Sequence, residues 1–295
     1  MTIIAGFSSS RQGIAPLNLA AQLSRTIGDK VIAAVIIERA LPAGVDPIED
    51  EFQEHVSMQA TKSLQRIVDQ VRYDGDISVV VHQSTSIPKG LMELVDHHHA
   101  DLVVVGSSSS GLLGKVALGS VTDRLVHTVG APVAIAPRGY SPNANPIERL
   151  TAAYGGAADA AGLIATSAEL AKRWGVRMRI ASFTVRPPSM FGGQVESSAE
   201  SLVIRQWARR NMDSALKQLN QARAMVDIDD VDVVVGAGTD WQDAVASITW
   251  EPGDMLLLGS GAAGPMAQVF LGSAAAKILR HAPVPVMIVP RQLST

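Results

Sequence analysis

The stretch Asp101-Leu-Val-Val-Val-Gly106-Ser-Ser-Ser-Ser-Gly-Leu-Leu-Gly-Lys-Val-Ala-Leu-Gly119-Ser120 decides the fold, because the chain contains a second version of it. The second version begins Asp254-Met-Leu-Leu-Leu-Gly259 and reaches Gly272-Ser273 with the same spacing. From Gly106 to Arg138, twelve residues meet identical residues in the stretch from Gly259 to Arg291, with no gap. Repetition of this kind indicates two copies of one domain.

The rest of the 295-residue chain extends the repeat outward from these stretches. The starts correspond as well, with Ile3-Ile4-Ala5-Gly6-Phe7 matching Leu150-Thr151-Ala152-Ala153-Tyr154. The segment 139–146 is rich in Pro, Asn, Ser and Gly, which is typical of a linker. We therefore expect one domain at residues 1–140 (copy one) and a second at 147–295 (copy two).

Each copy alternates apolar runs with amphipathic stretches, which favours strands alternating with helices. The expected strands are 2–7, 30–37, 77–81, 102–106 and 133–136 in copy one, and 149–154, 177–184, 231–235, 255–259 and 286–289 in copy two. The expected helices are 13–27, 50–73, 88–99 and 120–129, and then 158–174, 195–224, 240–249 and 273–281. Continuous apolar strands between helices predict an α/β fold with a doubly wound, five-stranded parallel sheet in each copy. The last strands, 133–136 and 286–289, are expected to pair at a two-fold intrachain interface, because pairing removes exposed strand edges.

The net charge and the amino-acid composition exclude several classes of partner and of chemistry. The formal net charge of −3 gives no electrostatic footprint for nucleic acid or for an anionic membrane surface, so neither is an expected partner. Cysteine is absent, which excludes disulfides, Cys-ligated zinc and a Cys nucleophile. The start of the sequence lacks the basic region and the long apolar run of a signal peptide, and we expect a cytoplasmic protein.

The loop after the fourth strand of each copy has the chemistry of an anion-binding site. Glycines allow backbone N–H groups to approach a phosphate, and the helix that follows directs its unpaired donors toward it. Ser120 and Ser273 are expected to cap these two helices. The loop has no Gly-Lys-Ser/Thr sequence, so it is not a Walker loop.

These stretches resemble the universal stress protein family, whose ATP-binding members carry Gly-x2-Gly-x9-Gly-Ser/Thr at this place. The resemblance covers nearly the whole chain and is closest over 101–138 and 254–291. It implies a Rossmann-like fold of the adenine-nucleotide α-hydrolase type, pairing through the last strand, and ATP as a ligand in some members but not in others. A tandem chain would form the pair within itself, and a further homodimer stays open.

Carried over by position, the family's motif gives candidate nucleotide-binding residues in each copy, and both motifs depart from the family's pattern. The second glycine of the motif is Ser109 in copy one and Ala262 in copy two. The acidic residue that contacts adenosine in the family is replaced by Ser8 and Gly155. The candidates are Ser8, Val35, Gly106, Ser109, Gly119, Ser120 and Val121 in copy one, and Gly155, Phe183, Gly259, Ala262, Gly272 and Ser273, expected to bind more weakly, in copy two.

Several other residues are interpreted as structural. Lys115 and Arg124 are expected at the solvated surface rather than on a phosphate. His97, His98 and His99 are consecutive, so their side chains cannot converge on a metal from one helix. Asp101 and Asp254 precede strands and are interpreted as turn residues.

Three functional hypotheses stay open. The first is a stress-response regulator that binds ATP or another adenine nucleotide weakly, or acts without it. The second is a nucleotide-independent interaction module whose phosphate loops are vestigial. The third is an adenine-nucleotide hydrolase or transferase, for which the sequence offers no recurring acid–base pair, no Gly-x-Ser-x-Gly and no His-Glu-x-x-His. We expect no catalytic residues and no metal, and either ATP or no cofactor at all.

Overall fold

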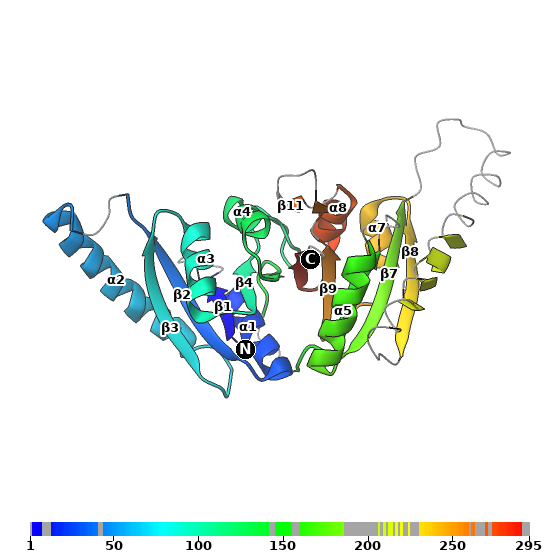
Figure 1. The fold of residues 1–295 in the computed structure, drawn as a ribbon, viewed down its shortest axis with the longest axis horizontal. Helices are drawn as coiled ribbons and strands as arrows, with labels where there is room; N and C mark the ends of the chain where they lie inside the picture. The colour runs from blue at the N-terminus through cyan, green and yellow to red at the C-terminus, as the bar shows by residue number, and fades with distance from the viewer. Residues whose placement is uncertain are drawn as a thin grey trace.

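Ten strands form one sheet that runs through both copies in the computed structural model (Figure 1). The structure describes residues 2–7, 13–40, 44–141, 145–154, 160–185, 230–259, 261–262, 269–270 and 273–290, with single residues or short runs between 206 and 224. The strands of copy one are β1 (Thr2–Gly6), β2 (Lys30–Glu38), β3 (Ile77–Ser84), β4 (Leu102–Gly106) and β5 (Val133–Ala136). Those of copy two are β6 (Arg149–Tyr154), β7 (Arg177–Val185), β8 (Val231–Gly238), β9 (Asp254–Gly259) and β12 (Val286–Val289).

The order of the strands is β3-β2-β1-β4-β5-β12-β9-β6-β7-β8, so each half repeats the other in reverse. All neighbours within a copy are parallel, and β5 pairs antiparallel with β12 at the centre, with Ala134 opposite Met287. The doubly wound fold and the pairing of the last strands are therefore confirmed, and the chain forms an intrachain pseudo-dimer.

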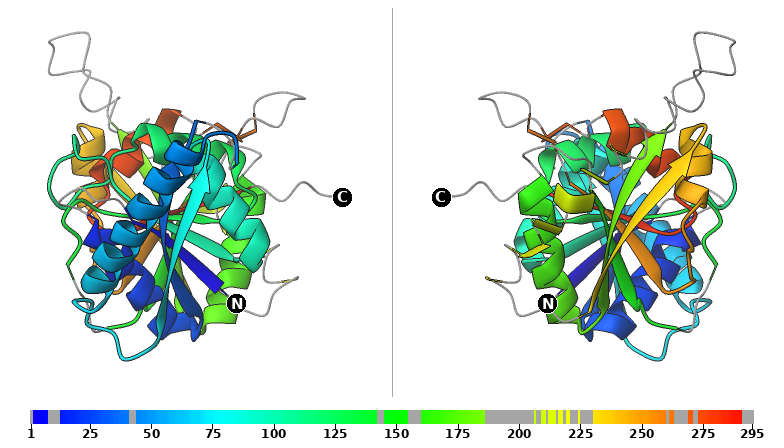
Figure 2. Two further views of the ribbon diagram at one scale, coloured as in Figure 1. Left: turned by 90° about the vertical axis from the view of Figure 1, so that its left-hand side faces the viewer. Right: turned by 90° about the vertical axis from the view of Figure 1, so that its right-hand side faces the viewer.

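Helices cover both faces of this sheet, which is why its strands are apolar throughout. One face carries α1 (Ile14–Ile27), α2 (Pro47–Val68) and α5 (Ala160–Trp174). The other carries α3 (Ile87–His98), α4 (Ser120–Thr128), α7 (Trp241–Ala246) and α8 (Ser273–His281). Figure 2 shows α2 and α3 on opposite sides of the copy-one strands. On each face the buried side chains of the two copies belong to one continuous apolar cluster.

Helix α1 is buried on nearly all sides, because the linker and copy two cover the side that the sheet leaves free. Asn18 Nδ2 donates to the carbonyl oxygen of Tyr140 at 3.0 Å, and the Tyr140 hydroxyl donates to Gln22. The amide of Ile147 donates to Thr26 Oγ1 at 2.7 Å. These bonds attach both ends of the linker to one helix.

A buried charge cluster lies at the start of copy two, where β6, β7 and β9 run side by side. Arg149 donates to both carboxylate oxygens of Asp254, each at 2.7 Å, and Asp254 is 1% exposed. Arg179 Nη2 lies 3.5 Å from the same carboxylate, and the Arg179 guanidinium lies over the Trp250 ring. Asp254 also accepts from the Glu251 amide, as a turn residue would, but its main partners are the two arginines.

The structure departs from the predicted elements in a few places. Strands β3 and β8 run three residues past their expected ends, to Ser84 and Gly238, and α7 covers only the middle of the expected helix 240–249. The loop of copy two contains a short antiparallel pair, β10 (Gly261–Ala262) and β11 (Val269–Phe270), that the sequence did not predict. The expected helix 195–224 lies largely outside the described residues, although the described positions from 206 onward in it are helical. Among the described helices, none has the length and apolarity to span a membrane.

Candidate functional site

A cavity of about 680 Å³ lies at the carboxyl ends of β1, β2 and β4 in copy one. In the order of strands, β1 and β4 are the neighbours between which the winding of the sheet reverses, and open α/β sheets bind ligands at such a point. The size falls in the range of small-molecule sites. All the candidates of copy one that the structure describes line this cavity, namely Val35, Gly106, Ser109, Gly119, Ser120 and Val121.

The loop from Ser107 to Gly119 forms the polar wall, and internal hydrogen bonds fix its shape. The Ser108 amide donates to the Ala117 carbonyl at 2.8 Å, and Ser107 Oγ accepts from the Ala117 amide at 2.7 Å. Arg138 Nη1 donates to the carbonyl oxygen of Gly111 at 2.6 Å. The loop is therefore a closed hairpin, and Ser107, Ser108 and Ser109 line the cavity.

Helix α4 begins at the cavity, and its first turn lacks a side-chain cap. Gly119, with φ −94° and ψ 169°, is the N-cap residue, and no side chain there bonds the helix. Ser120 is thus the first helical residue rather than the cap, which corrects our expectation. Gly119, Ser120, Val121 and Thr122 all line the cavity. Because first-turn N–H groups have no partner within a helix, this arrangement suits an anion.

The close approach of α1 leaves little room for a side chain at Gly106. A Cβ at Gly106 would lie 3.3 Å from Pro16 Cγ in α1, tighter than an ordinary contact. The carbonyl oxygen of Gly106 accepts from Thr122 Oγ1 at 3.4 Å, which holds the end of β4 against the start of α4.

The opposite wall of the cavity comes from α2 and was not predicted from the sequence. His55, Val56, Gln59, Ala60 and Ser63 line it, at a spacing that places them on one flank of the helix. The spacing was visible in the sequence, but any amphipathic helix shows it, so it could not identify a site. Among the described lining residues, His55 is the only one with a titratable side chain.

The candidates of copy two lie differently. The register of the strands makes Phe183 the counterpart of Ile36 rather than of Val35. Phe183 pairs with Gly236, the sixth residue of β8, and Ile36 pairs with His82, the sixth residue of β3. Successive strand residues face opposite ways, so the Phe183 side chain is buried against α7 and away from the face that carries Val35.

The remaining copy-two candidates lie partly outside the described residues. Ala262 lies in β10, opposite Val269 of β11. Gly259 ends β9, and Ser273 is the first residue of α8, not the residue before it. Ser8, Gly155 and Gly272 lie outside the described residues.

Neither Lys115 nor Arg124 lines the cavity. Lys115 Nζ instead donates to the carbonyl oxygen of His281, at the end of α8 in copy two, at 2.9 Å. Burial lowers the pKa of the Lys115 ammonium group. Lys115 is therefore a bridge between the copies, whereas the sequence suggested a solvated side chain. Among the described residues, no group of three or more His, Asp and Glu side chains is placed to hold a metal ion.

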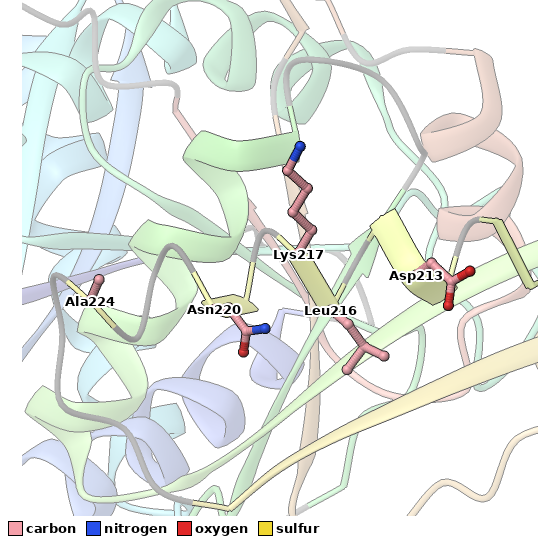
Figure 3. Close-up of a pocket in the computed structure, with 5 residues that line it drawn as sticks. All are labelled: Asp213, Leu216, Lys217, Asn220 and Ala224. Atoms are coloured by element: carbon pink, nitrogen blue, oxygen red, sulfur yellow. The ribbon is translucent and has the colours of Figure 1, made fainter.

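A second hollow of about 580 Å³ lies beside described helical residues of copy two (Figure 3). The side chain of Lys217 points away from those of Leu216 and Asn220, and Asp213 lies further along the same stretch. Polar groups that do not converge give no basis for a ligand. The lining residues are Asp213, Leu216, Lys217, Asn220 and Ala224.

The fold and this cavity define a class, a tandem doubly wound α/β protein with a cavity at the switch point of copy one. Comparison with known proteins identifies the family. The model of the universal stress protein family matches residues 1–137 and 146–290. The chain belongs to the universal stress protein family.

Individual relatives cover the whole chain. Universal stress proteins of Mycobacterium tuberculosis and Mycobacterium bovis are each 32% identical over 295 residues, covering 98% of this chain and 100% of theirs. A universal stress protein of Archaeoglobus fulgidus is similar in structure, with a TM-score of 0.57, 16% identity, and coverage of 98% of this chain and 96% of that one. A putative universal stress protein of Pseudomonas aeruginosa has a TM-score of 0.53, 13% identity, and coverage of 98% and 93%. The two structures share the fold.

Proposed function

We propose that copy one binds an adenine nucleotide in the 680 Å³ cavity, and that the chain is a cytoplasmic stress-response regulator rather than an enzyme. The observation that carries the proposal is that the candidate residues of copy one meet at a single cavity. Residues from three separate segments, predicted from the family motif, line one cavity together with the uncapped start of α4. Copy two is proposed as the partner that holds copy one in shape, with a weaker site or none.

The walls of the cavity suit the two ends of a nucleotide. The start of α4 and the hydroxyls of Ser108 and Ser109 offer donors to a phosphate. The Ser107 hydroxyl instead donates to the Ala117 carbonyl oxygen, at 3.3 Å, within the loop. Across the cavity, Phe7, Val35 and Val56 offer apolar surface to a base. This division of polar and apolar groups is usual for cofactor sites.

Binding without turnover fits the chemistry of the walls. Hydrolysis of a phosphate ester draws on carboxylates that hold a metal ion or orient a water. The described lining residues offer neither Asp nor Glu, and His55 is exposed. The proposed role is therefore that of a receptor, in which occupancy changes the stability or the contacts of the protein.

The first prediction tests the cavity with Gly119→Val, whose side chain would enter the phosphate end. The new Cβ would lie 3.6 Å from Ser108 Cβ, an ordinary contact, and the φ of Gly119 is open to valine, so the variant is expected to fold. Wild-type protein should be stabilised by millimolar ATP, by about 2.7 kcal/mol at 100 times the dissociation constant. The variant should lose most of this shift, as measured by thermal unfolding with and without ATP.

Gly130→Val is the matched control, because Gly130 is exposed, does not line the cavity, and has open space around a new Cβ. It should keep the full ATP shift. An equal shift in Gly119→Val and wild type would place ATP elsewhere and contradict the proposal.

The nucleotide-independent interaction module is a second candidate, and one observation favours it. Leu112 and Leu113, at the tip of the copy-one loop, are 75% and 77% exposed. Contiguous exposed apolar surface is a feature of protein contact sites. Wild-type protein that shows no ATP shift at several millimolar would leave this module as the better account.

A further inference from the structure

One flank of α2 carries two large apolar side chains that are exposed. Ile48 is 80% exposed and Phe52 is 59% exposed, and they lie one turn apart near the start of the helix. We call this pair the apolar flank of α2. Leaving such side chains in water forgoes a stabilisation of about 25 cal/mol for each Å² of apolar surface. Neighbouring apolar side chains in water on a well-fixed helix suggest a ligand.

The apolar flank continues the wall of the cavity. Positions 48, 52, 55, 59 and 63 recur at spacings of four and three residues, which places them along one line of an α-helix. Three of these five positions, His55, Gln59 and Ser63, line the cavity. Ile48 and Phe52 therefore extend the same wall outward from the cavity, toward the start of the helix.

Contacts on another side of α2 fix this orientation. Asp50 forms an ion pair with Arg39 at the end of β2, and Ser57 Oγ accepts from Gln83 Nε2 of β3 at 3.1 Å. The Asp46 side chain caps the helix by accepting from the Ile48 amide at 3.0 Å. The start of α2 is thus held at the sheet, and the apolar flank is presented by a rigid element.

The position of the flank fixes which part of a ligand can reach it. Anion-binding groups lie at the α4 end of the cavity, and the α2 end is lined by Val35, Val56 and Phe7. A nucleotide with its phosphates at α4 would direct its base toward α2. A group that reaches Phe52 would accordingly be attached to the base.

We propose that the apolar flank of α2 is part of the binding site, and that the site prefers an adenine nucleotide with an apolar substituent on its base. This inference rests on the proposed function, since it assumes a nucleotide in the cavity. Phe52 and Ile48 act as specificity-determining residues, and they select for the substituent rather than for the phosphates.

The test compares ATP with N6-benzyl-ATP by isothermal titration calorimetry. Wild-type protein should bind the benzyl derivative roughly tenfold more tightly, because its ring leaves water against Phe52. Phe52→Ser should remove this gain, so that the variant binds ATP and N6-benzyl-ATP with affinities within about twofold of each other. Met58→Ser is the matched control, since Met58 is 50% exposed on another flank of the same helix, and it should keep the gain. Ile48→Ser is a second variant, and it should also reduce the gain in affinity for N6-benzyl-ATP over ATP.

The outcomes separate this inference from the proposed function. Equal binding of ATP and N6-benzyl-ATP by wild type would overturn the inference and leave the proposed function standing. No binding of either would overturn both. Decyl phosphate that binds more tightly than N6-benzyl-ATP, with the difference lost in Phe52→Ser, would make the occupant a lipid phosphate and overturn the nucleotide assignment. An equal loss in Met58→Ser and Phe52→Ser would overturn the role of the flank.

Discussion

At the scale of single residues, Asp101 and Asp254 occupy equivalent positions of the repeat but have different structural roles. Asp101 is partly exposed and accepts one hydrogen bond, from the Thr2 amide at 3.1 Å. Asp254 is buried and neutralises Arg149, with Arg179 beside it. The pKa of Arg149 is raised by its hydrogen bonds to Asp254, whereas burial lowers the pKa of Arg179. Asp254 is the buried carboxylate of the cluster, and the more exposed Glu251 lies with its Oε1 3.9 Å from Arg149 Nη2.

We therefore predict that Asp254→Asn destabilises the protein strongly. Breaking a buried ion pair costs about 3–5 kcal/mol, because the remaining charges lose their partner inside the protein. Asp101→Asn, at the equivalent place in copy one, should cost about 1 kcal/mol or less, since it changes one partly exposed hydrogen bond. Urea unfolding of the two variants measures the difference. Similar losses in both would show that the arginines do not depend on Asp254.

The site residues show where sequence reasoning succeeds and where it stops. The spacing of Gly106, Ser109 and Gly119 was enough to place them at one site, because a family motif encodes a local loop that the chain closes by itself. The cap of α4 was misplaced by one residue, since glycine and serine are both good N-caps and only backbone geometry decides between them. The α2 wall was missed, because its residues meet the loop only through the fold of the sheet.

At the scale of elements, α1 and the linker act as one unit. Tyr140 follows β5, and its hydroxyl and carbonyl groups bond Gln22 and Asn18 of α1. Burial raises the pKa of Tyr140 to about 12. The hydroxyl can donate to Gln22 only while the phenol is protonated.

This raised pKa gives a prediction for alkaline pH. An unfolded tyrosine has a pKa of about 10, so its stabilising effect is complete below pH 10. As the pH rises from 10 toward 12, the unfolded chain loses the proton first, and the free energy of unfolding decreases. Tyr140→Phe should lower stability at pH 8 by about 1 kcal/mol, for the lost hydrogen bond, and should show a smaller decrease between pH 10 and 12. Denaturant unfolding at several pH values checks this, and identical alkaline slopes in both proteins would contradict it.

Elements in the centre of the sheet were predicted more closely than those at its edges. The bounds of β4, β5, β6 and β12 agree with the expected ones, because buried apolar runs end where polarity begins. At the edges, β3 and β8 continue through polar or glycine residues such as His82 and Gly236, because pairing with one neighbour is enough to extend a strand. In β8, a Cβ at Gly236 would lie 2.4 Å from the Ala244 carbonyl oxygen, so α7 packs there only because this residue is glycine.

At the scale of the whole molecule, contacts between the copies go beyond the paired strands. Strand β11 of copy two lies against α4 of copy one, where the cavity begins (Figure 1). Lys115 in the first loop holds the end of α8. With the cores continuous on both faces, neither copy has a boundary at which it can melt alone.

We predict a single cooperative unfolding transition for the chain. All four tryptophans, at positions 174, 207, 241 and 250, belong to copy two, so their fluorescence reports that copy alone. Far-UV circular dichroism reports both copies, and the two signals should give the same midpoint. Met287→Ala, which removes a fully buried side chain at the central strand pair, should lower both midpoints together, at a cost of about 2–5 kcal/mol. A dichroism transition in two steps, with only one step seen by fluorescence, would contradict this expectation.

The central strand pair also has a consequence for how this protein can evolve. In an assembly of two identical chains, every substitution is received twice, so a site cannot be lost from one half and kept in the other. Fusion removes that constraint along the whole chain. Thr122 and Ala275, at equivalent places in α4 and α8, have diverged. At the seam, Val133 matches Val286 and Ile135 matches Ile288, but Ala134 faces Met287 where two identical chains would pair identical residues. Duplication thus leaves each half free to specialise, at the seam as well as in the helices beside the loops.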